Sequence, residues 1–155
     1  MREAANRNST ARNLRSVAPE IEAMGIDLGL LLLRLWFGAA LFLKHGWEKP
    51  VHFAAMAVHF PDPVHIGPVP SLVIATLSDA VCSVLVVLGL ATRWAALFIF
   101  ANLFVAWALV HHFQFLAHGA DHGELTVLYL GAYLALALTG AGRFSLDARL
   151  FRRFR

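Results

Sequence analysis

The sequence predicts an all-α protein, a four-helix transmembrane bundle with a short interfacial helix in its first extracytoplasmic connection. Hydrophobic residues make up 59% of the 155 residues and charged residues only 15%, which is too apolar for an ordinary soluble domain. Four apolar runs also have roughly the length needed to cross a bilayer, at residues 26–47, 71–90, 94–113 and 124–142. Together they occupy most of the chain and leave no room for a separate soluble domain.

The basic residues indicate how these helices are oriented. Most arginines lie in residues 1–25, in the second connection or in residues 143–155, whereas the first connection carries only Lys44 and Lys49. Basic residues near membrane spans remain on the cytoplasmic side. We therefore expect a multi-pass protein of the bacterial plasma (inner) membrane with a flexible cytoplasmic tail at residues 1–25, a transmembrane domain at 26–142 and a basic cytoplasmic tail at 143–155.

The same charge pattern identifies the bilayer as a partner and argues against nucleic acid. The basic tail suits anionic lipid, and no basic patch interleaved with aromatic residues suggests a nucleic-acid interface. The single cysteine, Cys82, lies within the second run. It excludes an intramolecular disulfide or a cysteine metal cluster, so any redox chemistry needs an electron carrier from elsewhere.

One carboxylate, Asp79, lies near the middle of the second apolar run. The apolar residues of that run contribute about 3–6 kcal/mol to insertion, against about 3 kcal/mol for one central acid. Asp79 should then face protein, and the only basic residue away from the ends of another run is Arg34. We predict an Arg34–Asp79 pair as the polar centre of the bundle. The pair would be either a substrate or proton site, or a structural pair that fixes helix register.

The first connection ends in proline-rich turns. Residues 51–60 are apolar enough for a short helix at the outer interface, and the Pro-Asp-Pro and Gly-Pro steps that follow would end it. We expect this segment to cover the outer end of the bundle. At the start of the fourth run, Glu124 lies where a helix dipole favours an anion, and Tyr129 and Tyr133 share a face further along.

All eight histidines fall on the predicted outer side: His45, His52, His59, His65, His111, His112, His118 and His122. Histidines with carboxylates bind zinc or copper, or pass protons at a quinone site. His52 and His59 would share a helix face, and with His111 and His112 they are the candidate metal ligands. No two of these four candidate ligands form an HxxxH pair, however, and interfacial histidines are commonly only solvated, so both interpretations remain open.

Three stretches resemble the DoxX family of small four-helix membrane proteins: RLWFGAALFLKHGWEK, SDAVCSVLVVLGLATRWAAL and GELTVLYLGAYLALALTGAGRFSLD. They occur in the order and spacing of that family and cover residues 28–150. The family's Gly-x-x-Lys exit from the first helix is matched by Gly46 and Lys49. The sequence departs from the family in its second helix, where Asp79 replaces a glutamate.

The resemblance implies an oxidoreductase, because named members are linked to thiosulfate oxidation with electrons passed to quinone. We hypothesise a subunit or small enzyme of a quinone-linked oxidoreductase system acting on a small reductant, with a sulfur compound as one candidate. Arg34, Asp79 and Glu124 are the candidate catalytic residues. His45, Tyr129 and Tyr133 are the candidate quinone-binding residues.

Two other classes of function remain open. One is a non-enzymatic scaffold or accessory subunit that anchors a partner oxidoreductase subunit, or a homo-oligomer. The other is proton-coupled transport of a small solute. This class is less favoured, because four short helices offer little room for alternating access without oligomerisation.

Overall fold

The computed structural model describes residues 2–113 and 123–153, and their regular structure is helical. The first helical unit comprises α1 (Arg2–Leu41), the π-helical turn η1 (Phe42–Gly46) and α2 (Glu48–Val51). A second short helix, α3 (Phe53–Met56), follows it. The first connection thus contains a short helix, as the sequence predicted, in the form of the four residues of α3.

The remaining helices follow in sequence order. The second unit joins α4 (Pro68–Thr76), the π-helical turn η2 (Leu77–Cys82) and α5 (Ser83–Leu88). The third joins α6 (Thr92–Val105) to η3 (Ala106–Val110), and the fourth is α7 (Gly123–Thr139). A final amphipathic helix, α8 (Leu146–Arg153), lies within the predicted basic tail.

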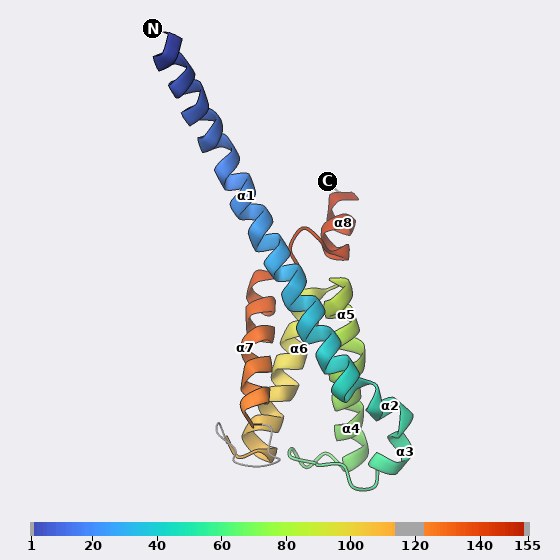
Figure 1. Cartoon of the computed structure of the whole chain (residues 1–155). Coiled ribbons are helices and arrows are strands. Elements are labelled where there is room, and N and C mark those ends of the chain that lie inside the picture. The colour runs from blue at the N-terminus through green and yellow to red at the C-terminus, as the bar shows by residue number, and fades with distance from the viewer. Residues whose placement is uncertain (1, 114–122, 154–155) are drawn as a thin grey trace.

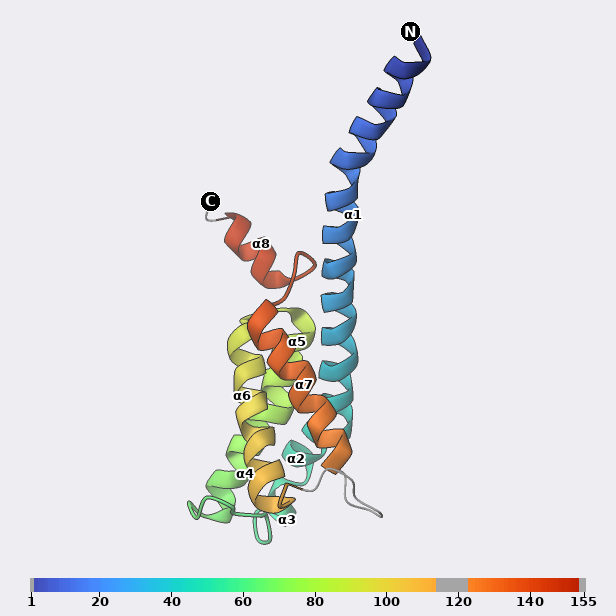
Figure 2. The ribbon, with the colours of Figure 1, turned by 90° about the vertical axis from the view of Figure 1, so that its left-hand side faces the viewer.

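The predicted membrane bundle is confirmed. Among the described residues, the helices Pro19–Val51, Pro68–Leu88 and Thr92–Val110 have the length and composition needed to cross a membrane, and Glu124–Thr139 is a shorter apolar helix. The four units lie side by side, and both chain ends lie at the same end of the bundle (Figures 1 and 2). We call this end the terminal end and the other the distal end. The boundary predicted at residue 25 falls inside α1.

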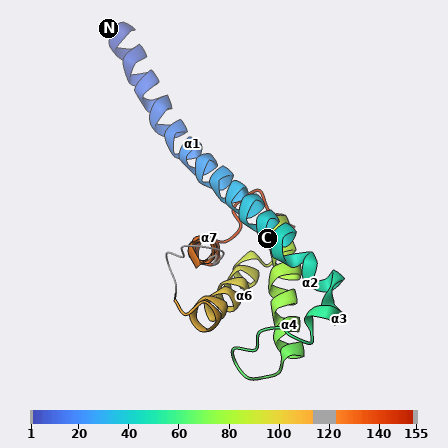
Figure 3. The same ribbon diagram turned by 60° about the horizontal axis from the view of Figure 1, so that its bottom comes forward.

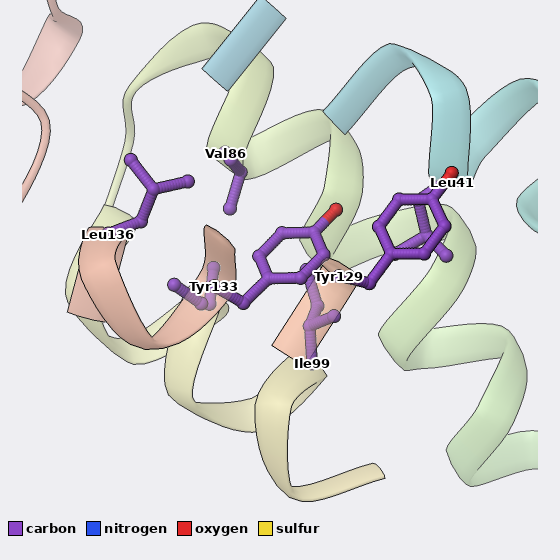
Figure 4. Packing of buried hydrophobic residues seen from close by; sticks show 8 residues of the cluster. Leu41, Val86, Ile99, Tyr129, Tyr133 and Leu136 are labelled. Carbon is purple, nitrogen blue, oxygen red and sulfur yellow. The ribbon is translucent and has the colours of Figure 1, made fainter. Parts of the chain in front are cut away.

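A compact core lies between the second, third and fourth units and the first. Tyr133, Leu136, Ile99 and Val86 are completely buried in it, and Figure 4 shows their side chains pointing toward one another. The Tyr133 hydroxyl donates a hydrogen bond to the Phe37 carbonyl oxygen at 3.1 Å, which ties α7 to α1. Most other large apolar side chains on these helices remain exposed, as is expected for surfaces that contact lipid tails.

Small residues set the register between the first and second units. A β-carbon at Gly46 would clash with the backbone of Asp79 and Ala80, and one at Gly38 would meet Val87 and the Ser83 carbonyl. The two units are therefore antiparallel and in close contact. This register determines which polar side chains can meet across the interface.

Candidate ligand cavity at the distal end

A cavity of about 560 Å³ opens at the distal end of the bundle, between the first, second, third and fourth units. We call it the Asp79 cavity. Its walls are mainly apolar, and its few polar residues include Asp79, Lys49, His45, Asn102 and Tyr129. The three π-helical turns all contribute to its lining, and such turns in α-helices are frequent at functional sites.

A buried ion pair lies in the wall of this cavity. The Lys49 ammonium lies 2.7 Å from Asp79 Oδ2 and also donates a hydrogen bond to the His45 carbonyl oxygen at 3.0 Å. Both side chains are buried, with 11% of the Lys49 side chain and 7% of the Asp79 side chain exposed. The second carboxylate oxygen, Asp79 Oδ1, is buried and has no hydrogen-bond partner within the protein.

Such an arrangement has free capacity for one polar ligand atom. An ammonium group has three donors, and the two protein acceptors occupy two of them. A buried carboxylate oxygen without a partner is costly, typically by about 1–3 kcal/mol. A ligand that accepts a hydrogen bond from Lys49, or donates one to Asp79 Oδ1, would recover part of that free energy.

The predicted Arg34–Asp79 pair is wrong, because the cation that pairs with Asp79 is Lys49. Helix register gives the reason: Gly46 packs against Asp79, whereas Arg34 lies against Gly89. Asp79 and Gly89 are ten residues apart along one helical unit, which corresponds to roughly 15 Å. That offset is too long for the arginine side chain to cover.

Arg34 instead belongs to a second buried polar group at the terminal end, which we call the Arg34 cluster: Arg34, Gly89, Phe144, Ser145 and Asp147. Its side chain is completely buried and donates a hydrogen bond from Nη2 to the Phe144 carbonyl oxygen. The Asp147 carboxylate accepts hydrogen bonds from the backbone amides that begin α6, at 2.8 and 3.1 Å. The Arg34 cluster thus docks the segment before α8 onto the bundle.

Asp27 supports the same segment from two turns earlier on α1. Its Oδ1 accepts a hydrogen bond from the Arg143 amide at 2.8 Å, and its Oδ2 lies 3.7 Å from Arg143 Nε. Backbone atoms of residues 143–147 are therefore held by α1 side chains on one side and by the α5–α6 turn on the other. This contact network indicates a structural role for Arg34.

The other predicted site residues divide between the cavity and the surface. His45, Tyr129 and His111 line the Asp79 cavity. Tyr133 is buried behind Tyr129, with which it stacks at a ring-centroid distance of 6.2 Å. The exposed residues are Glu124, His52, His59 and His112, and none of them lines the cavity.

The predicted metal ligands do not form a cluster in the part of the chain that the structure describes. Within residues 2–113 and 123–153, no group of three or more histidine, cysteine or acidic side chains is placed to hold a metal ion. His118 and His122 lie outside the described residues.

Sequence reasoning missed the role of Lys49 because it considered only basic residues inside the apolar runs. Lys49 lies just beyond the first run, on α2. One signal was available, since Lys49 is the lysine of the Gly-x-x-Lys motif.

The distal rim of the cavity is held by Asp62. Its carboxylate accepts hydrogen bonds from the amides of Ile66 and Gly67 and from the Ser71 hydroxyl, at 3.0, 2.7 and 2.8 Å. Partial burial raises the pKa of this carboxyl group, but the hydrogen bonds from Ser71, Gly67 and Ile66 outweigh it, so the pKa lies below its ordinary value. These bonds fix residues 60–66 beside the cavity.

The architecture and its two polar groups define a small helical membrane protein with a ligand cavity at one end. Comparison with known sequences identifies the family: the DoxX profile matches residues 29–112. The chain belongs to the DoxX family.

Individual relatives agree with this assignment. An uncharacterized protein of Haemophilus influenzae is 30% identical over 140 residues, covering 83% of this chain and 87% of the relative. The inner membrane protein YphA of Escherichia coli is 31% identical over 126 residues, covering 77% and 89%. No solved structure matches the chain.

Proposed function

We propose that this DoxX-family protein is a subunit or small enzyme of a quinone-linked oxidoreductase system, and that the Asp79 cavity binds the quinone head group. The observation that carries the proposal is the buried Lys49–Asp79 pair, which lines a mainly apolar cavity and leaves Asp79 Oδ1 without a protein partner. Since YphA is named an inner membrane protein, we place this chain in the bacterial inner membrane. The arginines around α8 favour cytoplasmic termini.

The residues present fit a quinone. The volume of about 560 Å³ lies within the usual range for small-molecule sites, about 300–1,000 Å³. Lys49 has one donor left for a quinone oxygen, and Tyr129 supplies an aromatic wall. A bound quinone would supply two-electron chemistry, taking up two electrons and two protons to become a quinol.

The protein's own groups would then orient the head group and move protons. Lys49 would hold one ring oxygen of the quinone, and Asp79 Oδ1 would exchange a proton with that oxygen. His45, which lines the same wall, would pass that proton toward the distal surface. Arg34 has no part in this chemistry, and Glu124 lies outside the cavity.

The reductant would be a small molecule, with sulfur compounds as the candidates that the family resemblance implies. Joining two sulfur anions through a new S–S bond releases two electrons, which balances reduction of one quinone with two protons from water.

The test is quinone binding by the full chain in lipid nanodiscs, measured by equilibrium dialysis with a benzoquinone that carries a short isoprenoid tail. Lys49→Met removes a charged hydrogen bond of about 1.5–3 kcal/mol, so affinity should fall roughly ten- to hundredfold. The double variant Lys49→Met/Asp79→Leu leaves no buried unpaired charge and should bind equally weakly.

The matched control is Lys44→Met, which changes an exposed lysine on the same π-helical turn as His45. It should bind quinone as the unmodified protein does. Unchanged binding by both Lys49 variants, or no binding by the unmodified protein, would contradict the quinone site.

A second candidate function is a scaffold that anchors a partner protein. It is favoured by α8, an amphipathic helix fixed to the bundle by Asp147 at its first turn. Truncation after residue 148 keeps Asp147 and removes most of α8. Loss of a co-purified partner with quinone binding intact would identify α8 as the docking element.

A further inference from the structure

We propose that the Asp79 cavity is entered from within the bilayer, through an opening between α4 and α6, and that it takes an amphiphile with a polar head and a long hydrocarbon tail. We call this opening the lateral portal and define it by Ile74, Phe98 and Ala101. The inference deepens the quinone site proposed above, on which it rests for the identity of the head group. The portal itself rests on separate observations.

The first observation is the exposure of the portal residues. Ile74, Phe98 and Ala101 all line the cavity, yet Ile74 is 38% exposed, Phe98 is 40% exposed and Ala101 is exposed as well. A side chain that both lines a cavity and faces the outside marks the edge of an opening. The cavity is therefore open on the side between α4 and α6, as well as toward the distal end, where Val64 and Ile66 also line it and are 47% and 48% exposed.

The second observation is the depth of this edge. All three portal residues belong to helices of membrane-spanning length. Ile74 lies six residues inside Pro68, or roughly 9 Å along the helix axis, and Ala101 lies nine residues inside Val110, or roughly 14 Å. Since the hydrocarbon core is about 30 Å thick, the portal faces lipid tails.

The third observation is the cover at the distal end. Phe60, Pro61, Pro63, Val64 and Ile66 line the cavity there, and Asp62 holds this segment by three hydrogen bonds. Figure 3, which brings the distal end forward, shows the connection between α3 and α4 crossing toward α6. This distal edge is mainly apolar, so it offers a polar ligand from the water little to bind. The hydrocarbon tail of a ligand from the bilayer can instead lie between α4 and α6.

The distribution of polarity along this route determines the chemistry of the ligand. The ion pair of Lys49 and Asp79 lies in the inner wall, while the portal is lined by apolar side chains. A molecule that fits both must carry hydrogen-bonding oxygen atoms at one end and hydrocarbon at the other. A quinone with an isoprenoid tail meets this description, and so does a lipid.

The test is photolabelling of the full chain in nanodiscs with two long-tailed probes, each carrying a diazirine next to its head group. One probe has a benzoquinone head and the other a phosphate head. The readout is adduct formation on Leu41 and Tyr129, which line the cavity and are only 1% and 6% exposed. Ala101→Trp fills the portal. Ala135→Trp is the matched control, because Ala135 is an exposed alanine of α7 outside the cavity lining.

We expect the quinone probe to label Leu41 and Tyr129 in the unmodified protein and in Ala135→Trp, and at least tenfold less in Ala101→Trp. Equal labelling in Ala101→Trp would overturn the portal and leave the quinone site standing. If the phosphate probe alone labels these residues, and Ala101→Trp abolishes that labelling, the portal is supported and the quinone site is contradicted. Failure of both probes to reach either residue would overturn the inference.

Discussion

Arg34 and Lys49 are two buried cations on one helical unit, but their surroundings differ. Arg34 hydrogen-bonds a backbone carbonyl in a segment that is itself held by Asp27 and the α5–α6 turn. Lys49 pairs with a carboxylate that keeps one oxygen free beside a cavity. The comparison teaches that burial of a charge does not by itself mark a functional site. Lys49 and Asp79 line a cavity themselves, whereas Arg34 does not line the hollow that Asp27, Arg143 and Phe144 border at the terminal end.

The largest expected effect concerns the stability of the Lys49–Asp79 pair. Lys49→Met leaves Asp79 as an unpaired buried charge, so the free energy of unfolding should fall by about 3–5 kcal/mol. Lys49→Met/Asp79→Leu removes both charges and should recover most of that loss. Steric trapping in bicelles measures the unmodified protein, Lys49→Met, Asp79→Leu and the double variant under one condition. A double variant that loses as much stability as Lys49→Met and Asp79→Leu together would show that the pair is not a coupled unit.

Arg34→Met should have the next largest effect, and on stability alone. It removes a charged hydrogen bond to the Phe144 carbonyl oxygen, which contributes about 1.5–3 kcal/mol. Amide hydrogen exchange at Asp147 should accelerate, while quinone affinity stays within twofold of the unmodified protein. Arg93→Met changes an exposed arginine and is the control. A tenfold loss of quinone affinity in Arg34→Met would assign Arg34 to the quinone site. It would contradict the distinction between a structural Arg34 and a ligand-binding Lys49.

The contrast also shows what the sequence could predict. Hydropathy identified the four helical units, and the position of Asp79 within an apolar run correctly required a buried cation nearby. The sequence pattern could not decide whether Arg34 or Lys49 is that cation, because this depends on the axial register between the first and second helical units. That register is fixed by close backbone contacts, such as Gly46 against Asp79. Hydrophobic periodicity does not encode such contacts.

The cavity was harder to predict than the helices. His45, Asp79 and Tyr129 were identified as site residues and do line it, because each is a polar or aromatic residue within an apolar run. The three π-helical turns around the cavity have no signature in apolar periodicity. The four candidate metal ligands are not grouped within the described part of the chain, since a shared side of the membrane does not by itself bring residues into one site.

Two glycines offer a matched, smaller test of the same contrast. A methyl group at Gly46 would meet the Asp79 backbone, and one at Gly89 would meet the Arg34 guanidinium and Ser145. Each alanine variant should lose about 1–3 kcal/mol of stability from overpacking, and Gly89 has a φ of +70° that disfavours alanine further. Only Gly46→Ala should weaken quinone binding. Gly131→Ala, with nothing within 4 Å of the added carbon, is the control.

Asp62 provides the smallest expected effect, at the rim of the Asp79 cavity. Because its pKa in the folded protein lies below the ordinary value, its carboxylate stabilises the fold above the unfolded pKa of about 4. That contribution is lost as the pH falls through the lower, folded pKa. Asp62→Asn should therefore lower the melting temperature near pH 7, and the difference should vanish in acid. Glu22→Gln, an exposed acid on α1, should show no such difference. A pH-independent effect of Asp62→Asn would show that packing holds residues 60–66 in place and that the charge of the Asp62 carboxylate does not.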